Sequence, residues 1–265
     1  MNKLIIFECN KNNIEKCTHA IHETLQNLSW IELITRNTRK EFISDKVLPS
    51  EPGVVIHSGG STGQGYQCFH TFQNLNQSAL ATGQWLQEQG IEPKACSYLN
   101  SLPINHVSGF MPWWRSQCWN SKHTWIKLSL MKDPIALENT FRDFFRKEHD
   151  PVLMSLVPTQ LHRLIAHPAG IKWLQSFTLI WIGGAYLSTE LAKKARNNNI
   201  NLAPCYGTTE TAAMVSVLKP DEFLSGRNDC GEPLKDVSLR VNKNSILEIK
   251  TSRLAIGRWR NGNLE

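Results

Sequence analysis

The chain has 265 residues, of which 41% are hydrophobic, and this is enough apolar material for a substantial buried core. It contains no run of eighteen apolar residues, and its N-terminal apolar stretch is too short for a signal peptide, so we expect a soluble cytoplasmic protein without a membrane span. The formal net charge is +6, but the basic residues are scattered, which fits a small anionic ligand and gives nucleic-acid binding no support.

Short apolar runs alternate with helix-like stretches from residue 54 onward, after a lead-in over residues 1–50. This pattern predicts an α/β fold with a mostly parallel sheet and crossover helices. The expected strands are short and partly β-branched or aromatic: Val54–Ser58, Cys96–Ile104, His123–Leu128, Val152–Val157, Thr178–Gly183 and Leu202–Tyr206. The expected helices have apolar residues at helical spacing: Phe72–Gln89, Leu137–Lys147 and Ser188–Arg196.

The last part of the chain has a different pattern. Residues 238–242 and 245–252 alternate apolar and polar side chains around Lys243 and Asn244, which predicts a β-hairpin. We therefore expect an α/β domain over residues 1–230 and the start of a small antiparallel unit over residues 231–265.

Neither the cysteines nor most of the histidines form a recognisable site. The seven cysteines are an odd number, and none lies in a CxxC pair, so we expect buried or idle thiols. Histidines without metal-ligand spacing are expected to be structural or on the surface: His57, His70, His123, His149, His162 and His167.

A glycine-rich loop, HSGGSTGQG at residues 57–65, follows the apolar run VVI and precedes an expected helix. Backbone N–H groups in such a loop can point at an anion, and the hydroxyls of Ser58, Ser61 and Thr62 add donors for phosphate oxygens. The alternative is an ordinary turn rich in small residues.

The residues of this loop exclude two familiar nucleotide-binding motifs. A Walker A loop would continue with Lys and Ser or Thr after Gly65, where Tyr66 and Gln67 stand. A dinucleotide-binding fingerprint would need a different spacing of glycines than Gly60, Gly63 and Gly65 provide.

Three further segments follow the loop in a definite order: PINHVSG (residues 103–109), WIGGAYLS (181–188) and YGTTE (206–210). This order resembles the adenylate-forming superfamily of acyl-CoA synthetases, peptide-synthetase adenylation domains and luciferases, in which each segment lines one shared site. Within that superfamily the chain is similar to the 2-succinylbenzoate-CoA ligases of menaquinone and phylloquinone biosynthesis, through HVSGFMPWWR (106–115) and ILEIKTSRLA (246–255).

The resemblance implies a role for each segment in a site for ATP, Mg²⁺ and an acid, with CoA as co-substrate. The nucleotide would be held by Ser58, Gly59, Gly60, Ser61, Thr62, Gly63, Gly183, Gly184, Ala185, Tyr206, Gly207 and Thr208. The acid would be bound by His106, Ser108, Arg115 and Gly184. Catalysis would involve His106, Thr209 and Glu210, with Glu210 also holding Mg²⁺, which prefers hard oxygen ligands.

Each of these residues also has a simpler interpretation. Glu210 alone could be a first-turn carboxylate of a helix, and residues 183–185 a turn between a strand and a helix. A lone His106 could be structural. For the segment Trp113–Arg115, a wall of an acyl pocket competes with a buried helix face that carries an exposed Arg115, and we favour the latter for Arg115.

The chain departs from the superfamily pattern in two ways. The usual loop continues to a Lys after its Pro, whereas this loop reads QGYQC, so the pyrophosphate loses one stabilising cation. The Thr-Gly-Asp segment and the smaller C-terminal domain of the superfamily are not found, so we expect the N-terminal domain only, with little thioester formation by the chain alone.

The sequence thus predicts an ATP-dependent acid-CoA ligase that forms an acyl-AMP intermediate from 2-succinylbenzoate. Two alternatives stay open: a synthetase for another aryl or fatty acid, and a non-catalytic remnant that binds a nucleotide or a protein. Whether the protein forms a homo-oligomer also stays open.

Overall fold

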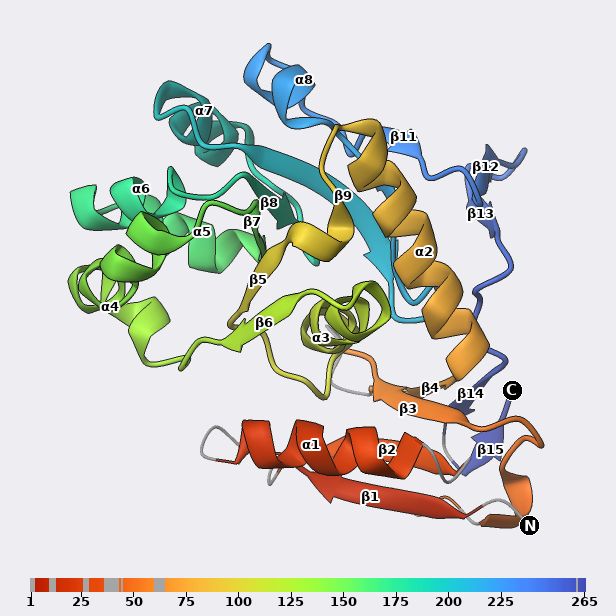
Figure 1. The fold of residues 1–265 in the computed structure, drawn as a ribbon. Coiled ribbons are helices and arrows are strands. Elements are labelled where there is room, and N and C mark those ends of the chain that lie inside the picture. Colours follow the sequence, from red (N-terminus) through yellow and green to blue (C-terminus); the bar gives the residue numbers. More distant parts are fainter. Residues whose placement is uncertain are drawn as a thin grey trace.

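A computed structural model describes residues 3–9, 13–25, 29–35, 43, 45–59, 65–260 and 262–265. Two β-sheets enclose a layer of helices, and further helices cover the outer face of the larger sheet (Figure 1). The α/β fold class predicted from the alternation of apolar runs and helical stretches is confirmed.

The larger sheet has seven strands in the order β11-β10-β9-β8-β7-β5-β6. Strands β5 to β9 pair in parallel, whereas β10 and β11 add antiparallel strands at one edge. The strands are β5 (Ser97–Asn100), β6 (Lys122–Trp125), β7 (Val152–Leu156), β8 (Leu179–Ile182), β9 (Leu202–Thr208), β10 (Ala213–Val217) and β11 (Glu232–Pro233).

Helices cover both faces of this sheet. The helices are α1 (Ile14–Leu25), α2 (Phe72–Glu88), α3 (Val107–Trp119), α4 (Pro134–Lys147), α5 (Pro158–Ile165), α6 (Pro168–Leu174), α7 (Thr189–Asn197) and α8 (Pro220–Leu224), with short 3₁₀ turns at Asp45–Val47, Pro93–Ala95 and Leu130–Lys132. Strand β8 shows the consequence for the sequence: Ile180 and Ile182 pack toward α4–α7, and Leu179 and Trp181 pack toward α2 and α3. A strand buried on both faces must be apolar at every position, as LIWI is.

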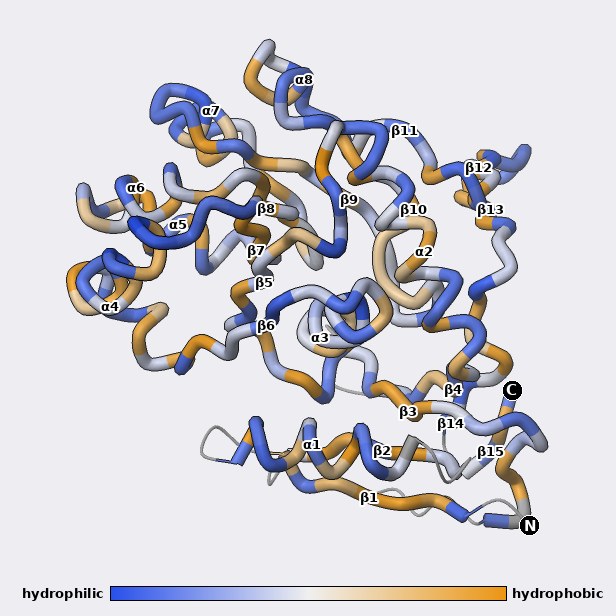
Figure 2. Tube along the Cα trace, in the orientation of Figure 1, coloured by the Kyte–Doolittle hydropathy of each residue, from blue (hydrophilic) through white to orange (hydrophobic). Residues whose placement is uncertain are grey.

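The smaller sheet has the strand order β1-β2-β3-β4-β14-β15 and lies on the other side of α1, α2 and α3 (Figure 1). Its strands are β1 (Leu4–Glu8), β2 (Trp30–Ile34), β3 (Gly53–His57), β4 (Gln67–Thr71), β14 (Gly257–Arg260) and β15 (Asn263–Leu264). A separate hairpin is formed by β12 (Ser238–Val241) and β13 (Leu247–Lys250). Hydrophobic residues concentrate along β1 and β3, whereas the outer turns of α7 are hydrophilic (Figure 2).

Most predicted elements are confirmed with changes in their ends, and the largest change is in the strand predicted at Cys96–Ile104, since β5 ends at Asn100. Helix α2 ends just before Gly90, whose φ is +74°, and Ser188 caps α7 by accepting from the N–H of Leu191. The predicted hairpin is β12 and β13.

The helix expected after the glycine-rich loop is confirmed as α2, but strand β4, which the sequence did not predict, comes between the loop and this helix. The loop connects the antiparallel strands β3 and β4, and β4 is fully buried since it pairs with β3 on one side and β14 on the other. The strand predicted at Val54–Ser58 also lies in the smaller sheet and not beside β5–β9.

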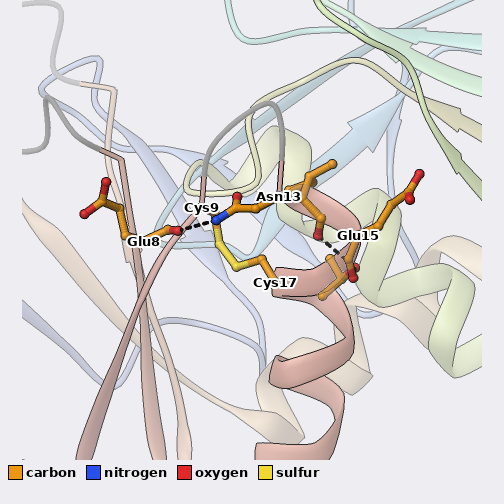
Figure 3. The surroundings of a disulfide bond; sticks show 7 residues. Glu8, Cys9, Asn13, Glu15 and Cys17 are labelled. Atoms are coloured by element: carbon orange, nitrogen blue, oxygen red, sulfur yellow. Dashed lines mark hydrogen bonds between the residues drawn. A yellow bond between two sulfur atoms is a disulfide. The ribbon is translucent and has the colours of Figure 1, made fainter.

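Two of the seven cysteines are joined. Cys9, just after β1, forms a disulfide with Cys17 on α1, with 6.0 Å between their Cα atoms (Figure 3). The expectation of idle thiols is therefore wrong for this pair, because α1 folds back along β1 and brings the two side chains together. The other five cysteines are free. No helix among the described residues combines the length and apolar character needed to cross a lipid bilayer.

Candidate functional site

The carboxyl ends of the neighbouring parallel strands β8 and β9 meet at one edge of the larger sheet, where open α/β sheets commonly bind ligands. Gly183 follows β8 and lies against β9, since a Cβ there would be 2.9 Å from Sγ of Cys205. Gly184, with a φ of +78°, and Ala185 are exposed on the turn that leads to α7. This segment is thus a strand-to-helix turn, in which Gly183 permits close packing on β9 and Gly184 and Ala185 are exposed.

Strand β9 extends past this edge and carries the YGTTE segment. Tyr206 is 39% exposed, so its ring is available to a ligand. Gly207 lies directly against β10, because a Cβ there would be 2.1 Å from the carbonyl oxygen of Ala213. Thr208 and Thr209 are half-buried at the start of the turn to β10.

The turn over residues 209–212 is held by side chains. Thr211 accepts from the N–H of Thr208 at 3.0 Å, and its hydroxyl contacts the carbonyl of Ala213 at 2.7 Å. Ala212 and Ala213 have positive φ angles of 51° and 86°, a conformation that is unfavourable for residues with a Cβ. The turn is therefore strained and depends on its contacts with the rest of the protein.

A buried polar chain supports this turn from α2 and the segment before β14. Ser78 donates to the carbonyl of Ala212 at 2.6 Å and accepts from the fully buried Arg253 at 2.9 Å. Arg253 in turn contacts the carboxylate of Asp236 at 2.8 Å. The N–H of Ala255 also donates to the backbone carbonyl of Glu210 at 2.7 Å.

The two ends of the glycine-rich loop are tied together. The N–H of Ser58 donates to the carbonyl of Tyr66, and the N–H of Tyr66 donates to the hydroxyl of Ser58, each at 2.9 Å. Ser58 is half-buried and Gly59 exposed. The predicted phosphate-binding residues Gly60, Ser61, Thr62 and Gly63 lie outside the described residues.

Glu210 is joined to this loop across 144 positions of sequence. The phenol of Tyr66 donates a short hydrogen bond to Oε1 of Glu210. Burial, reinforced by this carboxylate, raises the pKa of Tyr66 to about 12, so the phenol keeps its proton. Burial alone would raise the pKa of Glu210, but hydrogen bonds, the strongest of them from Tyr66, hold it below its usual value.

The interpretation of Glu210 as a first-turn helix carboxylate is wrong, because residues 209–212 form a turn between two strands. Glu210 is instead an ionised, half-buried carboxylate at the edge of the sheet. No group of three or more metal-ligating side chains is present in the part of the chain that the structure describes. A single carboxylate of this kind fits Mg²⁺, which is commonly held by one or two carboxylates together with substrate phosphates and water.

His70, on β4, also contacts the YGTTE segment. Its Nε2 lies 2.7 Å from the carbonyl oxygen of Thr209, to which it donates. Burial lowers the pKa of His70 to about 4, so the ring is neutral at pH 7.

This burial predicts a pH dependence of stability. The pKa of His70 in the folded protein lies below the usual value near 6.5, so the unfolded chain takes up the proton first. The contribution of His70 to stability is therefore complete above pH 6.5 and falls toward pH 4. Replacing His70 by Gln keeps a donor for Thr209 and removes the titration. The free energy of unfolding, measured with urea at pH 7, 6 and 5, should change less with pH in the variant. The slope of this free energy against pH should be smaller than in the wild type by up to about 1.4 kcal/mol per pH unit. Equal slopes would show that His70 is not held neutral.

His106 lies beside the start of the loop. It forms an isolated parallel bridge with His57, and its Nδ1 lies 3.2 Å from the carbonyl oxygen of His57. The ring of His57 is fixed by Glu32, with 2.9 Å between Nε2 and Oε1. Ser108 is half-buried in the first turn of α3. The structure therefore brings His106 to the loop.

Arg115 does not lie on the surface, contrary to the position we favoured from the sequence. It is 1% exposed, and its guanidinium lies 5.8 Å from the centre of the Trp181 ring. Its Nε and Nη2 make no hydrogen bond with the described residues. Trp113 and Trp114 are buried against Phe110 on the same helix.

Sequence reasoning missed three side chains that shape the site: Tyr66, His70 and Thr211. Tyr66 and His70 contact residues that are distant in sequence, and only the fold brings them together. Thr211 could have been found from the sequence, because it directly follows YGTTE. A fourth, Arg258 on β14, lies with its guanidinium 5.9 Å from the centre of the Tyr66 ring.

The sequence profile of a family described as AMP-binding enzyme matches residues 4–249. The 2-succinylbenzoate–CoA ligase of Escherichia coli (strain K12) is 30% identical over 207 residues, which are 78% of this chain and 40% of that protein. The enzyme of the same name from Haemophilus influenzae is 26% identical over 253 residues, with 95% and 48% covered. The chain spans less than half the length of these curated relatives.

Solved structures share the fold. A double mutant of o-succinylbenzoate CoA synthetase from Bacillus subtilis, bound with a product analogue, has a TM-score of 0.71 at 16% identity, covering 98% of this chain and 61% of that one. The Bacillus subtilis enzyme in complex with ATP and magnesium ion has a TM-score of 0.64 at 16% identity, with 97% and 52% covered. The wild-type Escherichia coli enzyme MenE, with a bound m-phenylether-linked analogue of OSB-AMS, has a TM-score of 0.61 at 24% identity, with 94% and 53% covered.

Proposed function

The chain belongs to the AMP-binding enzyme family, and we propose that it is the adenylate-forming part of a 2-succinylbenzoate–CoA ligase. In the proposed reaction, a carboxylate oxygen of the acid attacks the α-phosphorus of ATP, which gives acyl-AMP and releases pyrophosphate. The thiol of CoA then attacks the acyl carbon, which gives the thioester and releases AMP.

The observation that carries this proposal is the hydrogen bond that joins Tyr66 to Glu210. It joins Tyr66, directly after the glycine-rich loop, to the YGTTE segment, although the two are far apart in sequence, and Tyr66 is itself tied to Ser58 at the start of the loop. A phosphate-binding loop beside an ionised carboxylate can hold a metal–triphosphate, and adenylation depends chiefly on such positioning and charge stabilisation.

We assign the remaining residues from their places at this edge. Gly184, Ala185 and Tyr206 would contact the adenine, and His106 would lie beside the reacting carboxylate. A general base is not required, because the attacking carboxylate is already ionised at pH 7. Bound Mg²⁺ at Glu210 would offset the charge between the triphosphate and the acid.

Arg115 is the candidate for binding a carboxylate of the dianionic acid. Burial lowers its pKa, and the two nitrogens without a partner make an ionised guanidinium costly unless an anion approaches. The acid would then lie close to Arg115 on α3, near the ring of Trp181.

Acid-dependent exchange of labelled pyrophosphate into ATP tests the proposal, because it reports acyl-AMP formation alone. We expect exchange with 2-succinylbenzoate at least about 10-fold faster than with benzoate or a medium-chain fatty acid. Faster exchange with another acid would favour a synthetase of different specificity. Nucleotide binding without exchange with any acid would favour a non-catalytic remnant.

A further inference from the structure

The edge beside Glu210 contains a cation that comes from β14 and not from the glycine-rich loop. Arg258 stands opposite Cys68 in the β4–β14 register, one strand away from the exit of the loop. Its guanidinium carbon lies 5.9 Å from the centre of the Tyr66 ring, and the phenol of the same ring donates to Glu210. One aromatic side chain therefore contacts both the carboxylate and the cation.

The guanidinium of Arg258 has N–H donors that are available to a ligand. Its side chain is 51% exposed, and its donors make no hydrogen bond with the residues that the structure describes. Its nearest carboxylate is that of Glu265, with 3.7 Å between Nη2 and Oε2, and Glu265 is itself 52% exposed. An exposed pair at this distance contributes little, so Arg258 can turn to a better anion without losing much.

The charge of Arg258 reaches the site. It helps to hold the pKa of Glu210 low and opposes the rise in the pKa of Tyr66. Arg258 and Glu210 do not form an ion pair, and Tyr66 occupies one carboxylate oxygen. A half-buried carboxylate and an exposed guanidinium that are not paired with each other thus both contact the side chain of Tyr66.

A metal-bound polyphosphate has the chemistry to bind both of these groups. Guanidinium groups bind phosphate oxygens through paired N–H donors, and an aromatic face holds the guanidinium in place by a cation–π contact. The loop itself supplies no positive side chain at QGYQC.

We propose that Arg258 binds the β- and γ-phosphates of a nucleoside triphosphate beside Glu210, with the ring of Tyr66 as its support. This assignment rests on the proposed function, since it requires that a nucleoside triphosphate binds at Glu210. Arg258 then takes the place of a cation in the loop.

Equilibrium binding of MgATP and of AMP by calorimetry tests the assignment in the whole chain. We expect Arg258→Ala to weaken MgATP binding about 10-fold and to leave AMP binding unchanged, because AMP lacks the two phosphates. Arg258→Lys should keep most of the affinity for MgATP. Arg240→Ala is the matched control, because Arg240 is also an exposed strand arginine but pairs with Glu248 on the separate hairpin.

Unequal losses of the two ligands are the critical result. An Arg258→Ala protein that loses affinity for AMP and MgATP equally would overturn the assignment, because the loss would then not come from the two outer phosphates.

Failure of the proposed function has a different signature. If the wild-type chain binds neither MgATP nor AMP, the proposed function fails and the assignment of Arg258 fails with it. If the wild type binds both and Arg258→Ala binds MgATP equally well, only the assignment of Arg258 fails.

Discussion

Replacing Glu210 by Gln is expected to weaken MgATP binding by about 100-fold while leaving AMP binding in the absence of Mg²⁺ nearly unchanged. The amide still accepts the hydrogen bond from Tyr66, so the loop and the YGTTE segment stay joined, but the negative charge that attracts the metal is lost. Calorimetric titration with MgATP, and with AMP in EDTA, measures the two affinities.

The matched control is Glu190→Gln. Glu190 is also a carboxylate with a lowered pKa, because Lys194 donates to it, but it lies on the exposed face of α7. This variant should bind MgATP as the wild type does. If Glu210→Gln also kept its full affinity, the metal would be held elsewhere and our account of the site would be wrong. Glu210→Gln should also differ from Arg258→Ala, because ATP binding by the Arg258→Ala variant should still require Mg²⁺.

The strands that the sequence predicted best are those whose burial is visible locally. LIWI and VVI are apolar at successive positions because both of their faces are covered, and such runs need no knowledge of their partners. Strand β4 was missed for the opposite reason. QCFHT does not alternate, and its burial comes from β14, which is almost 190 residues later in the chain and pairs Gly257 with Phe69.

The site also combines features that are visible within one segment and features that depend on distant partners. The glycine loop, the GGA turn and YGTTE could be found because each is a contiguous segment, whereas the contacts between them could not. Nothing in the sequence pairs Tyr66 with Glu210, since their hydrogen bond depends on how β4 and β9 are placed in different sheets. The sequence also did not show whether the side chain of Arg115 is buried. Arg115 lies next to aromatic residues on a helix that is buried between the two sheets, so the helix has no polar face that would mark it.

The glycine of YGTTE can be tested for a purely structural role. Gly207 stands opposite Met214 in the β9–β10 pair, and a Cβ would lie 2.1 Å from the carbonyl oxygen of Ala213 and 2.5 Å from Cα of Met214. Both atoms belong to the backbone and cannot move aside as a flexible side chain would. Gly207→Ala should therefore lower the free energy of unfolding by about 3 kcal/mol or more, measured by urea denaturation followed by circular dichroism.

Gly59→Ala provides the contrast within the same site. Gly59 is exposed, and a Cβ there would meet none of the described residues within 4 Å, so this change should alter the free energy of unfolding by less than about 0.5 kcal/mol. Equal stabilities of the two variants would show that β9 and β10 can separate without loss. The expected difference means that Gly207 is required to form the turn that carries Glu210, whereas any requirement for Gly59 comes from the ligand that the loop binds.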